Sequence, residues 1–143
     1  MIATQANLRA AVGELIVGYV EALAGVTTCD LEVPQGYIYE LLSVKGRHND
    51  NAASKFCGFQ LLDFIGGVVS FGTRSTAYTE SLSLFDHDQT VNPLTYPYSG
   101  NWEGPFFLTY GSTIRFTVTA IGGAKQAFID YVVRRFRGIE YLG

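Results

Sequence analysis

The clearest structural signal in the chain is the segment STIRFTVTAIGGAKQAFIDYVVRRFR, residues 112–137. From Thr113 to Ala120, polar and apolar residues alternate, which is the period of a strand with one buried face. The paired glycines Gly122 and Gly123 can supply the positive φ angles of a two-residue hairpin turn. The pattern therefore predicts two strands joined by a tight turn.

The return strand, residues 126–137, differs from the first because both of its faces are apolar. Phe128, Val132 and Phe136 fall on one face, and Tyr131 and Val133 fall on the other. Two covered faces are expected of a strand at the centre of a packed assembly. We expect this hairpin to form the middle of an antiparallel sandwich.

Strand patterns account for most of the remaining chain. The segments 28–33, 37–47, 56–65, 78–85 and 106–110 are short, apolar or alternating, and bounded by turn residues. A polar loop is expected at 48–54. Seven or eight strands at this spacing predict an all-β protein, an antiparallel β-sandwich of jelly-roll or immunoglobulin type.

Residues 1–26 are ambiguous and are treated as an N-terminal arm before a sandwich domain at 27–143. Leu8, Leu15, Ile16 and Tyr19 fit a helical spacing, and Gly25 stands where a helix would end. The apolar run at 15–20 fits a strand equally well, because a short run has no decisive period. The helix is slightly favoured, and the segment is expected either on a neighbouring molecule or on its own domain.

Composition favours a binding protein over a nucleic-acid or membrane protein. The 143 residues carry a net charge of −3, so no overall field attracts nucleic acid or anionic lipid. Only 16% of residues are charged while 14% are aromatic, against about 25% charged in typical domains. This balance predicts that more surface is covered than one domain needs, by other copies or by a partner protein.

The cysteines and the apolar segments suggest a protein made and kept in a reducing compartment. Cys29 and Cys57 show no metal or redox spacing and are expected to be two buried thiols. The N-terminus lacks the charged region of a signal peptide, and the run at 15–20 is too short to span a bilayer. We expect a soluble product of cytoplasmic synthesis.

No motif in the sequence carries enzyme or metal chemistry. The two histidines, His48 and His87, fall in separate predicted loops and cannot supply the ligand set of a catalytic zinc. The cluster Asp86-His87-Asp88 lacks the spacing of a calcium loop and is interpreted as a solvated turn. The sequence contains no nucleophile elbow and no phosphate-binding glycine loop. We expect no enzyme activity, no cofactor and no metal.

Three aromatic residues share the long loop from 86 to 104. The rings of Tyr96, Tyr98 and Trp102 could stack on sugars, or they could plug the end of the sandwich or fill a subunit interface. They form the candidate ligand loop.

The remaining candidate contacts are apolar and basic residues near the two ends of the chain. Arg135 and Arg137 share a strand face and Arg134 points to the other, so the arginines form no single patch. Arginine suits ion pairs at protein interfaces. The candidate interface residues are Leu15, Ile16, Tyr19, Arg134, Arg135 and Arg137.

One segment resembles a known family. Residues 25–44, GVTTCDLEVPQGYIYELLSV, are similar to the opening of small jelly-roll proteins on tailed-phage virions, in which a threonine-rich strand leads to Val-Pro-x-Gly, an aromatic residue and Leu-Leu-Ser-Val. Tyr110-Gly111-Ser112-Thr113-Ile114 resembles the glycine before their penultimate strand. The likeness covers residues 25–137 loosely, through short motifs only.

The resemblance implies that the sandwich is of jelly-roll type and that the protein is a capsid decoration or cement protein. Such proteins are typically homotrimers that sit over junctions of the major capsid protein on the capsid surface, and they bring no catalytic residues. We therefore expect a non-enzymatic virion protein that is assembled in the host cytoplasm and binds the major capsid protein and itself. The alternatives are a carbohydrate-binding β-sandwich module, a tail or baseplate subunit, and a glycan-active enzyme on the same scaffold.

Overall fold

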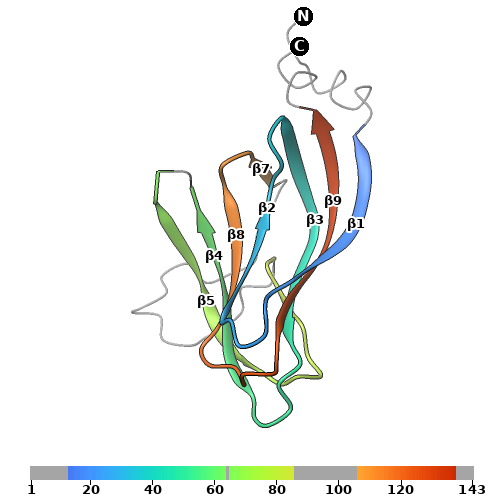
Figure 1. The fold of residues 1–143 in the computed structure, drawn as a ribbon. Coiled ribbons are helices and arrows are strands. Elements are labelled where there is room, and N and C mark those ends of the chain that lie inside the picture. The colour runs from blue at the N-terminus through green and yellow to red at the C-terminus, as the bar shows by residue number, and fades with distance from the viewer. Residues whose placement is uncertain (1–12, 64, 86–105, 138–143) are drawn as a thin grey trace, which may run out of the picture.

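The structure is a computed structural model, and it describes residues 13–63, 65–85 and 106–137. Within these ranges the chain forms strands and turns and no helix. The strands are β1 (Glu14–Glu21), β2 (Thr28–Glu32), β3 (Tyr37–His48), β4 (Lys55–Leu62), β5 (Val68–Thr76), β6 (Leu82–Ser83), β7 (Phe107–Thr109), β8 (Thr113–Val118) and β9 (Ala127–Arg137) (Figure 1).

The strands form two antiparallel sheets that face each other in a sandwich, as the sequence predicted. The β9 sheet has the order β1-β9-β3-β6, with β7 also paired to β3. The β8 sheet has the order β2-β8-β4-β5. Consecutive strands often lie in opposite sheets, so the chain crosses the sandwich repeatedly (Figure 1).

One apolar core fills the space between the two sheets. Each sheet contributes alternate side chains to it, because successive residues of a strand point to opposite faces. Phe116 of β8 lies at its centre, with the ring centroid of Phe59 5.2 Å away. The largest completely buried apolar side chains are Phe116, Leu82, Leu84, Leu108, Ile114, Ile129, Val44 and Val133. Each contributes about 1.5–3 kcal/mol by leaving water.

The predicted hairpin at residues 112–137 is wrong, although both of its strands exist. β8 pairs with β2 and β4, whereas β9 pairs with β1 and β3, so their connection crosses between sheets. Gly122 and Gly123 do not have positive φ angles. Alternation identifies a strand and its faces, but it does not identify the strand with which it pairs. The segment that connects β8 to β9 is long enough to span the roughly 10 Å between packed sheets. As predicted, Val132 and Val133 fall on opposite faces of β9.

The helix favoured within residues 1–26 is also wrong for the part that the structure describes. Residues 14–21 form β1, which pairs with β9 residue for residue. Gly18 fits the strand because a side chain there would press against the hydroxyl of Tyr131. The apolar spacing was compatible with both states, and pairing with the two-faced strand β9 selects the strand. Residues 1–12 lie outside the described ranges.

Two further expectations about the strands need correction. The segment 78–85 was expected to be one strand, but only Leu82–Ser83 is extended and residues 78 and 79 form a turn. Residues 68–76 were not predicted as a strand and form β5. β5 lacks an apolar alternation because polar residues also occupy inward positions, with Arg74 opposite the buried Cys57 and Thr76 completely buried. The expected strands at 28–33, 37–47, 56–65 and 106–110 are present with shifted ends.

Asp50 is a buried carboxylate that holds the crossover between β8 and β9. Its Oδ2 accepts a hydrogen bond from the N–H of Gly122 at 2.9 Å, and its Oδ1 accepts one from the N–H of Ala52 at 3.1 Å. Lys55 adds an ion pair at 3.5 Å. The backbone hydrogen bonds, chiefly that from Gly122, lower the pKa of the Asp50 carboxyl below its ordinary value.

His48 lies beside this carboxylate and was wrongly expected in a loop. It is the last residue of β3 and is buried. The amide of Asp50 donates to Nδ1 of His48 at 3.1 Å, so the ring proton is on Nε2, which lies 2.7 Å from the carbonyl oxygen of Thr76. The histidine therefore joins the end of β3 to the end of β5.

Candidate functional site

The outer face of the β9 sheet presents cross-strand rows of side chains to solvent. Strand register fixes these rows, because residues opposite one another point to the same side. We define the outer-face surface by the residues of four rows across β1, β9 and β3: Leu15, Arg134 and Glu40; Val17, Val132, Leu42 and Ser43; Tyr19, Asp130 and Lys45; Glu21, Phe128 and Arg47.

The second row is apolar across all three strands. Val17 of β1 lies opposite Val132 of β9. On the other side, the register of β3 shifts between Leu41 and Ser43, and this bulge places both Leu42 and Ser43 toward the outside. Val17 is 73% exposed and Leu42 is 42% exposed. Covering a water-facing apolar row of this kind with another surface lowers the free energy, so the row favours binding.

Two further apolar side chains of β1 extend this row along the strand. Leu15 is 61% exposed and Tyr19 is 63% exposed, and both point to the same side as Val17. β1 therefore presents three large apolar side chains in alternating positions. None of them contributes to the core of its own domain.

Charged residues flank the apolar row on one side. The Nε of Arg47 donates to Oδ2 of Asp130 at 2.7 Å, and the guanidinium lies 4.2 Å from the ring centroid of Phe128. Lys45 lies directly opposite Asp130. A shallow groove of about 420 Å³ runs here, lined by Val17, Gly18, Tyr19, Ser43, Lys45, Asp130, Tyr131 and Val132. Its polar groups lie beside apolar ones, as in the rim and centre of a protein interface.

The outer face of the β8 sheet is chemically different. Its central row consists of small or hydroxyl residues, Thr28, Thr117, Gly58 and Thr73, while its exposed apolar residues Phe56 and Val68 lie toward opposite ends of the β4–β5 pair. Its one strong charge pair is satisfied internally, because Arg115 donates two hydrogen bonds to Asp30 at 2.8 and 2.9 Å. The two outer faces of the sandwich therefore differ. An apolar row crosses three described strands on the face of the β9 sheet, whereas the exposed apolar residues Phe56 and Val68 of the β8 sheet lie apart.

The structure separates the candidate interface residues into two groups. Leu15, Tyr19 and Arg134 lie on the outer-face surface. Ile16 packs against the core instead. Arg135 is engaged within the chain, with its Nη2 2.7 Å from Glu14 and its guanidinium 4.6 Å from the ring centroid of Tyr37. Arg137 is exposed at the end of β9, on the same face as Arg135.

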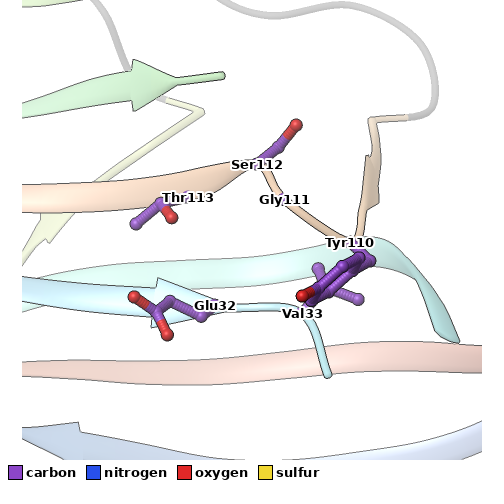
Figure 2. A pocket seen from close by; sticks show the side chains of 6 residues that line it. All are labelled: Glu32, Val33, Tyr110, Gly111, Ser112 and Thr113. Atoms are coloured by element: carbon purple, nitrogen blue, oxygen red, sulfur yellow. The ribbon is translucent and has the colours of Figure 1, made fainter. Parts of the chain in front are cut away.

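The candidate ligand loop with Tyr96, Tyr98 and Trp102 lies outside the described residues. A different aromatic residue, Tyr110, borders a depression of about 490 Å³ between the end of β2 and the turn from β7 to β8. Figure 2 shows its six lining residues, Glu32, Val33, Tyr110, Gly111, Ser112 and Thr113. The turn bends at Gly111, whose φ of 93° favours glycine.

The depression has a mixed lining. The ring of Tyr110 is 58% exposed. Glu32 and Thr113 lie opposite one another on β2 and β8, and both line the same depression as the ring of Tyr110 (Figure 2). An exposed ring with neighbouring polar groups can stack on and hydrogen-bond a sugar.

The described residues show little that could perform covalent or metal chemistry. Both cysteines are buried, as expected, and burial raises the pKa of the Cys29 and Cys57 thiols to about 11, so neither is a reactive thiolate at neutral pH. Within residues 13–63, 65–85 and 106–137, no three histidine, cysteine, aspartate or glutamate side chains gather into a possible metal site. The same ranges contain no helix long and apolar enough to cross a membrane.

No protein-family model, curated protein or solved structure matches the chain at a significant level.

The sequence interpretation missed the centre of the outer-face surface. Val17, Val132 and Lys45 were not candidate residues, although Val17 lies in the same apolar run as Leu15 and Tyr19. Period-two spacing of Leu15, Val17 and Tyr19 is the signal that could have grouped them. The partner strands of β1 were needed to place Val132 and Lys45 beside them.

Proposed function

We propose that this protein is a non-enzymatic structural protein of a virion, a decoration or cement subunit on the capsid surface that binds the major capsid protein and copies of itself. The observation that carries the proposal is the unequal chemistry of the two outer faces. Val17 and Leu42 are exposed in a row that continues through Val132, whereas the centre of the opposite face is polar and its exposed apolar residues, Phe56 and Val68, lie apart. A surface of this kind supports binding to another polypeptide.

We further propose that the sandwich is a jelly roll. The strand orders β1-β9-β3-β6 and β2-β8-β4-β5 support it, because the chain alternates between the two sheets as two Greek keys require. Capsid proteins and lectins both use this architecture. The fold therefore fits the leading function and its rival equally, and the choice depends on surface chemistry.

The proposed mechanism is stabilisation by additional burial. A subunit that binds only the assembled shell stabilises that shell by RT ln(1 + [L]/Kd) per site, where [L] is the concentration of free subunit. Standard interfaces bury about 1,600 Å² in total. The outer-face surface would supply the apolar centre of such a contact, and Lys45, Asp130 and Arg47 would lie at its polar rim. The homotrimer that the resemblance implies would multiply the contacts of each copy.

The test is binding to purified phage heads that lack the protein, with measurement of bound protein and of the heating that opens the shell. We expect wild-type protein to bind and to raise the opening temperature. Leu42→Asp should lose binding, because it places a carboxylate in the apolar row without touching the core.

The matched control is Ser75→Asp, an exposed position on the outer face of the β8 sheet. It adds the same charge and should bind like wild type. Failure of the wild-type protein to associate with any part of a particle would contradict the proposal. Association with tails or baseplates would support a structural role in the virion but would place the protein there and not on the capsid.

A carbohydrate-binding module is the second candidate, and the Tyr110 depression favours it. The exposed ring, the carboxylate of Glu32 and the hydroxyls of Ser112 and Thr113 fit a sugar's apolar face and hydroxyl rim. Glycan-array binding that is lost in Tyr110→Ala or Trp102→Ala would promote this function over the first. A negative array leaves the structural role as the only proposal.

A further inference from the structure

We propose that β1 is a pairing edge, at which two copies of this chain join antiparallel to each other and continue the β9 sheet across a two-fold axis. β1 is the outermost strand of its sheet, and no described strand lies beyond it (Figure 1). The inference deepens the proposed function and rests on it, since it assigns the self-association surface of the same subunit.

β1 lacks the features that usually protect an edge strand. It runs over eight residues, Glu14–Glu21, in unbroken register with β9, and it contains no lysine, no proline and no bulge. The other edges are protected: β2 has five residues and is followed by Pro34, β6 has two residues, and the pairing of β5 shifts register between Gly58 and Gln60. A long, flat, apolar edge is a template for another strand.

The hydrogen-bond pattern shows which residues of β1 are open at this edge. The N–H of Ala22 donates to the carbonyl of Ala127 at 3.0 Å, which directs the even-numbered residues of β1 toward β9. Because backbone groups alternate in direction along a strand, Leu15, Val17 and Tyr19 direct their N–H and C=O groups away from the sheet. The open backbone groups and the exposed apolar side chains therefore belong to the same three residues.

This pattern limits the register of a β1–β1′ pair. In an antiparallel pair, a residue whose backbone groups point to the partner lies opposite another such residue. Odd-numbered positions of β1 therefore pair with odd-numbered positions of β1′. Centring the pair on Val17 and Val17′ places Leu15 opposite Tyr19′, so every large apolar side chain on the outer side meets another. Centring it on Gly18 would instead place Glu21 opposite Leu15′. The structure therefore favours the Val17 register.

Charge is compatible with a second copy as the partner. Glu14 and Glu21 are the only charged residues of β1, and Glu14 is already neutralised by Arg135 at 2.7 Å. In the Val17 register Glu14 lies opposite Val20′ and Glu21 lies opposite Gly13′, so no two carboxylates oppose each other. Such a pair is isologous and closes on itself.

The paired copies would present one continuous outer face. The apolar row from Val17 to Leu42 would meet its two-fold mate at the junction, which doubles the surface available to a shell. A two-fold contact gives a dimer, or a hexamer if a three-fold contact also exists elsewhere on the subunit.

The first test is the mass of the purified full-length protein in solution by sedimentation equilibrium. Val17→Lys should halve the mass of the wild-type assembly, from dimer to monomer or from hexamer to trimer. The reason is that two lysines would then face each other directly across the axis. Val68→Lys, at an exposed position on the β5 edge, is the matched control and should leave the mass unchanged.

The second test retains the strand and measures its register. Across a hydrogen-bonded antiparallel pair the Cα atoms are about 5.5 Å apart, which a disulfide can bridge. Val17→Cys should therefore form a covalent dimer under mild oxidation. Leu15→Cys should not, because the two Leu15 positions are separated by about four residues, or roughly 13 Å. The native Cys29 and Cys57 are buried and do not compete.

These experiments distinguish a failure of the β1 pairing from a failure of the proposed virion role. A monomeric wild-type protein, a mass that Val17→Lys leaves unchanged, or the absence of a Val17→Cys crosslink would each overturn β1 pairing. Binding of such a monomer to phage heads would leave the proposed function intact. A paired protein that binds no particle would retain the pairing and reject the virion role.

Discussion

Gly46 of β3 lies directly beneath the ring of Phe116, the side chain at the centre of the core. A Cβ atom at position 46 would overlap the Cδ1 and Cε1 atoms of that ring. Phe116 is completely buried between the sheets and contacts Phe59, so it cannot move aside without disturbing its neighbours. The absence of a side chain at Gly46 is therefore what allows the two sheets to pack at this point.

We expect Gly46→Ala to lower the free energy of unfolding by about 1–3 kcal/mol through overpacking. Urea denaturation followed by tryptophan fluorescence and circular dichroism measures this. Gly123→Ala is the control, because nothing lies within 4 Å of a Cβ there and its φ is not positive. Its effect should be within about 0.5 kcal/mol, and equal effects of the two substitutions would contradict the packing described.

The lowered pKa of Asp50 predicts how the stability of the fold changes at acidic pH. Its pKa is lowered from the ordinary value of 3.8 by the N–H groups of Gly122 and Ala52, so its charged form stabilises the folded state. That stabilisation is present above pH 3.8 and is lost as the pH falls through the lowered pKa. Asp50→Asn should unfold at a lower temperature than wild type at pH 7, and the difference should shrink below pH 4.

Thermal unfolding from pH 2 to pH 7 measures this difference. Glu32→Gln, which removes an exposed carboxylate at the end of β2, should unfold in parallel with wild type over the same range. A difference between wild type and Asp50→Asn that stays constant at all pH values would mean that Asp50 does not hold the crossover as a carboxylate.

The strands of the β9 sheet differ in how firmly they are held. β9 pairs along its length with β1 on one side and with β3 on the other. β6 has two residues and, among the described strands, pairs with β3 alone. We expect amide protons of β9 to exchange with deuterium far more slowly than those of β6, because opening β9 requires breaking two ladders. Exchange of both strands at the same rate would contradict this pairing.

Sequence patterns predicted the positions of strands better than they predicted which strands pair with each other. The alternation at 113–118 and the two apolar faces of 127–137 gave both strands, because burial dictates which side chains face inward. Their assignment to opposite sheets depends on long-range contacts, such as that of Asp50 with Gly122, which no local pattern records. β5 was missed for a local reason, since the inward residues Arg74 and Thr76 are polar and the segment therefore shows no alternation.

The candidate site was predicted in part. Leu15 and Tyr19 were expected at an interface and are exposed on the outer-face surface. Ile16 was grouped with them while the segment was left open between helix and strand, and in a helix neighbouring residues can share a broad face. In a strand, Ile16 must point the other way. Val132 and Lys45 join the surface only through the register of β1, β9 and β3.

At the scale of the whole molecule, the difference between the two outer faces indicates which surface other polypeptides cover. The core is complete without Leu15, Val17 and Tyr19, yet these side chains remain apolar and exposed on one strand. In the same strand, the backbone groups that face away from β9 belong to these residues. We therefore expect other polypeptides, first of all another copy of this chain, to cover β1 and the outer-face surface.

Sedimentation equilibrium of the wild-type protein at micromolar concentration tests this claim most directly. The account predicts a particle of at least twice the mass of one chain. A single species with the mass of one chain, unchanged as the concentration rises, would contradict it.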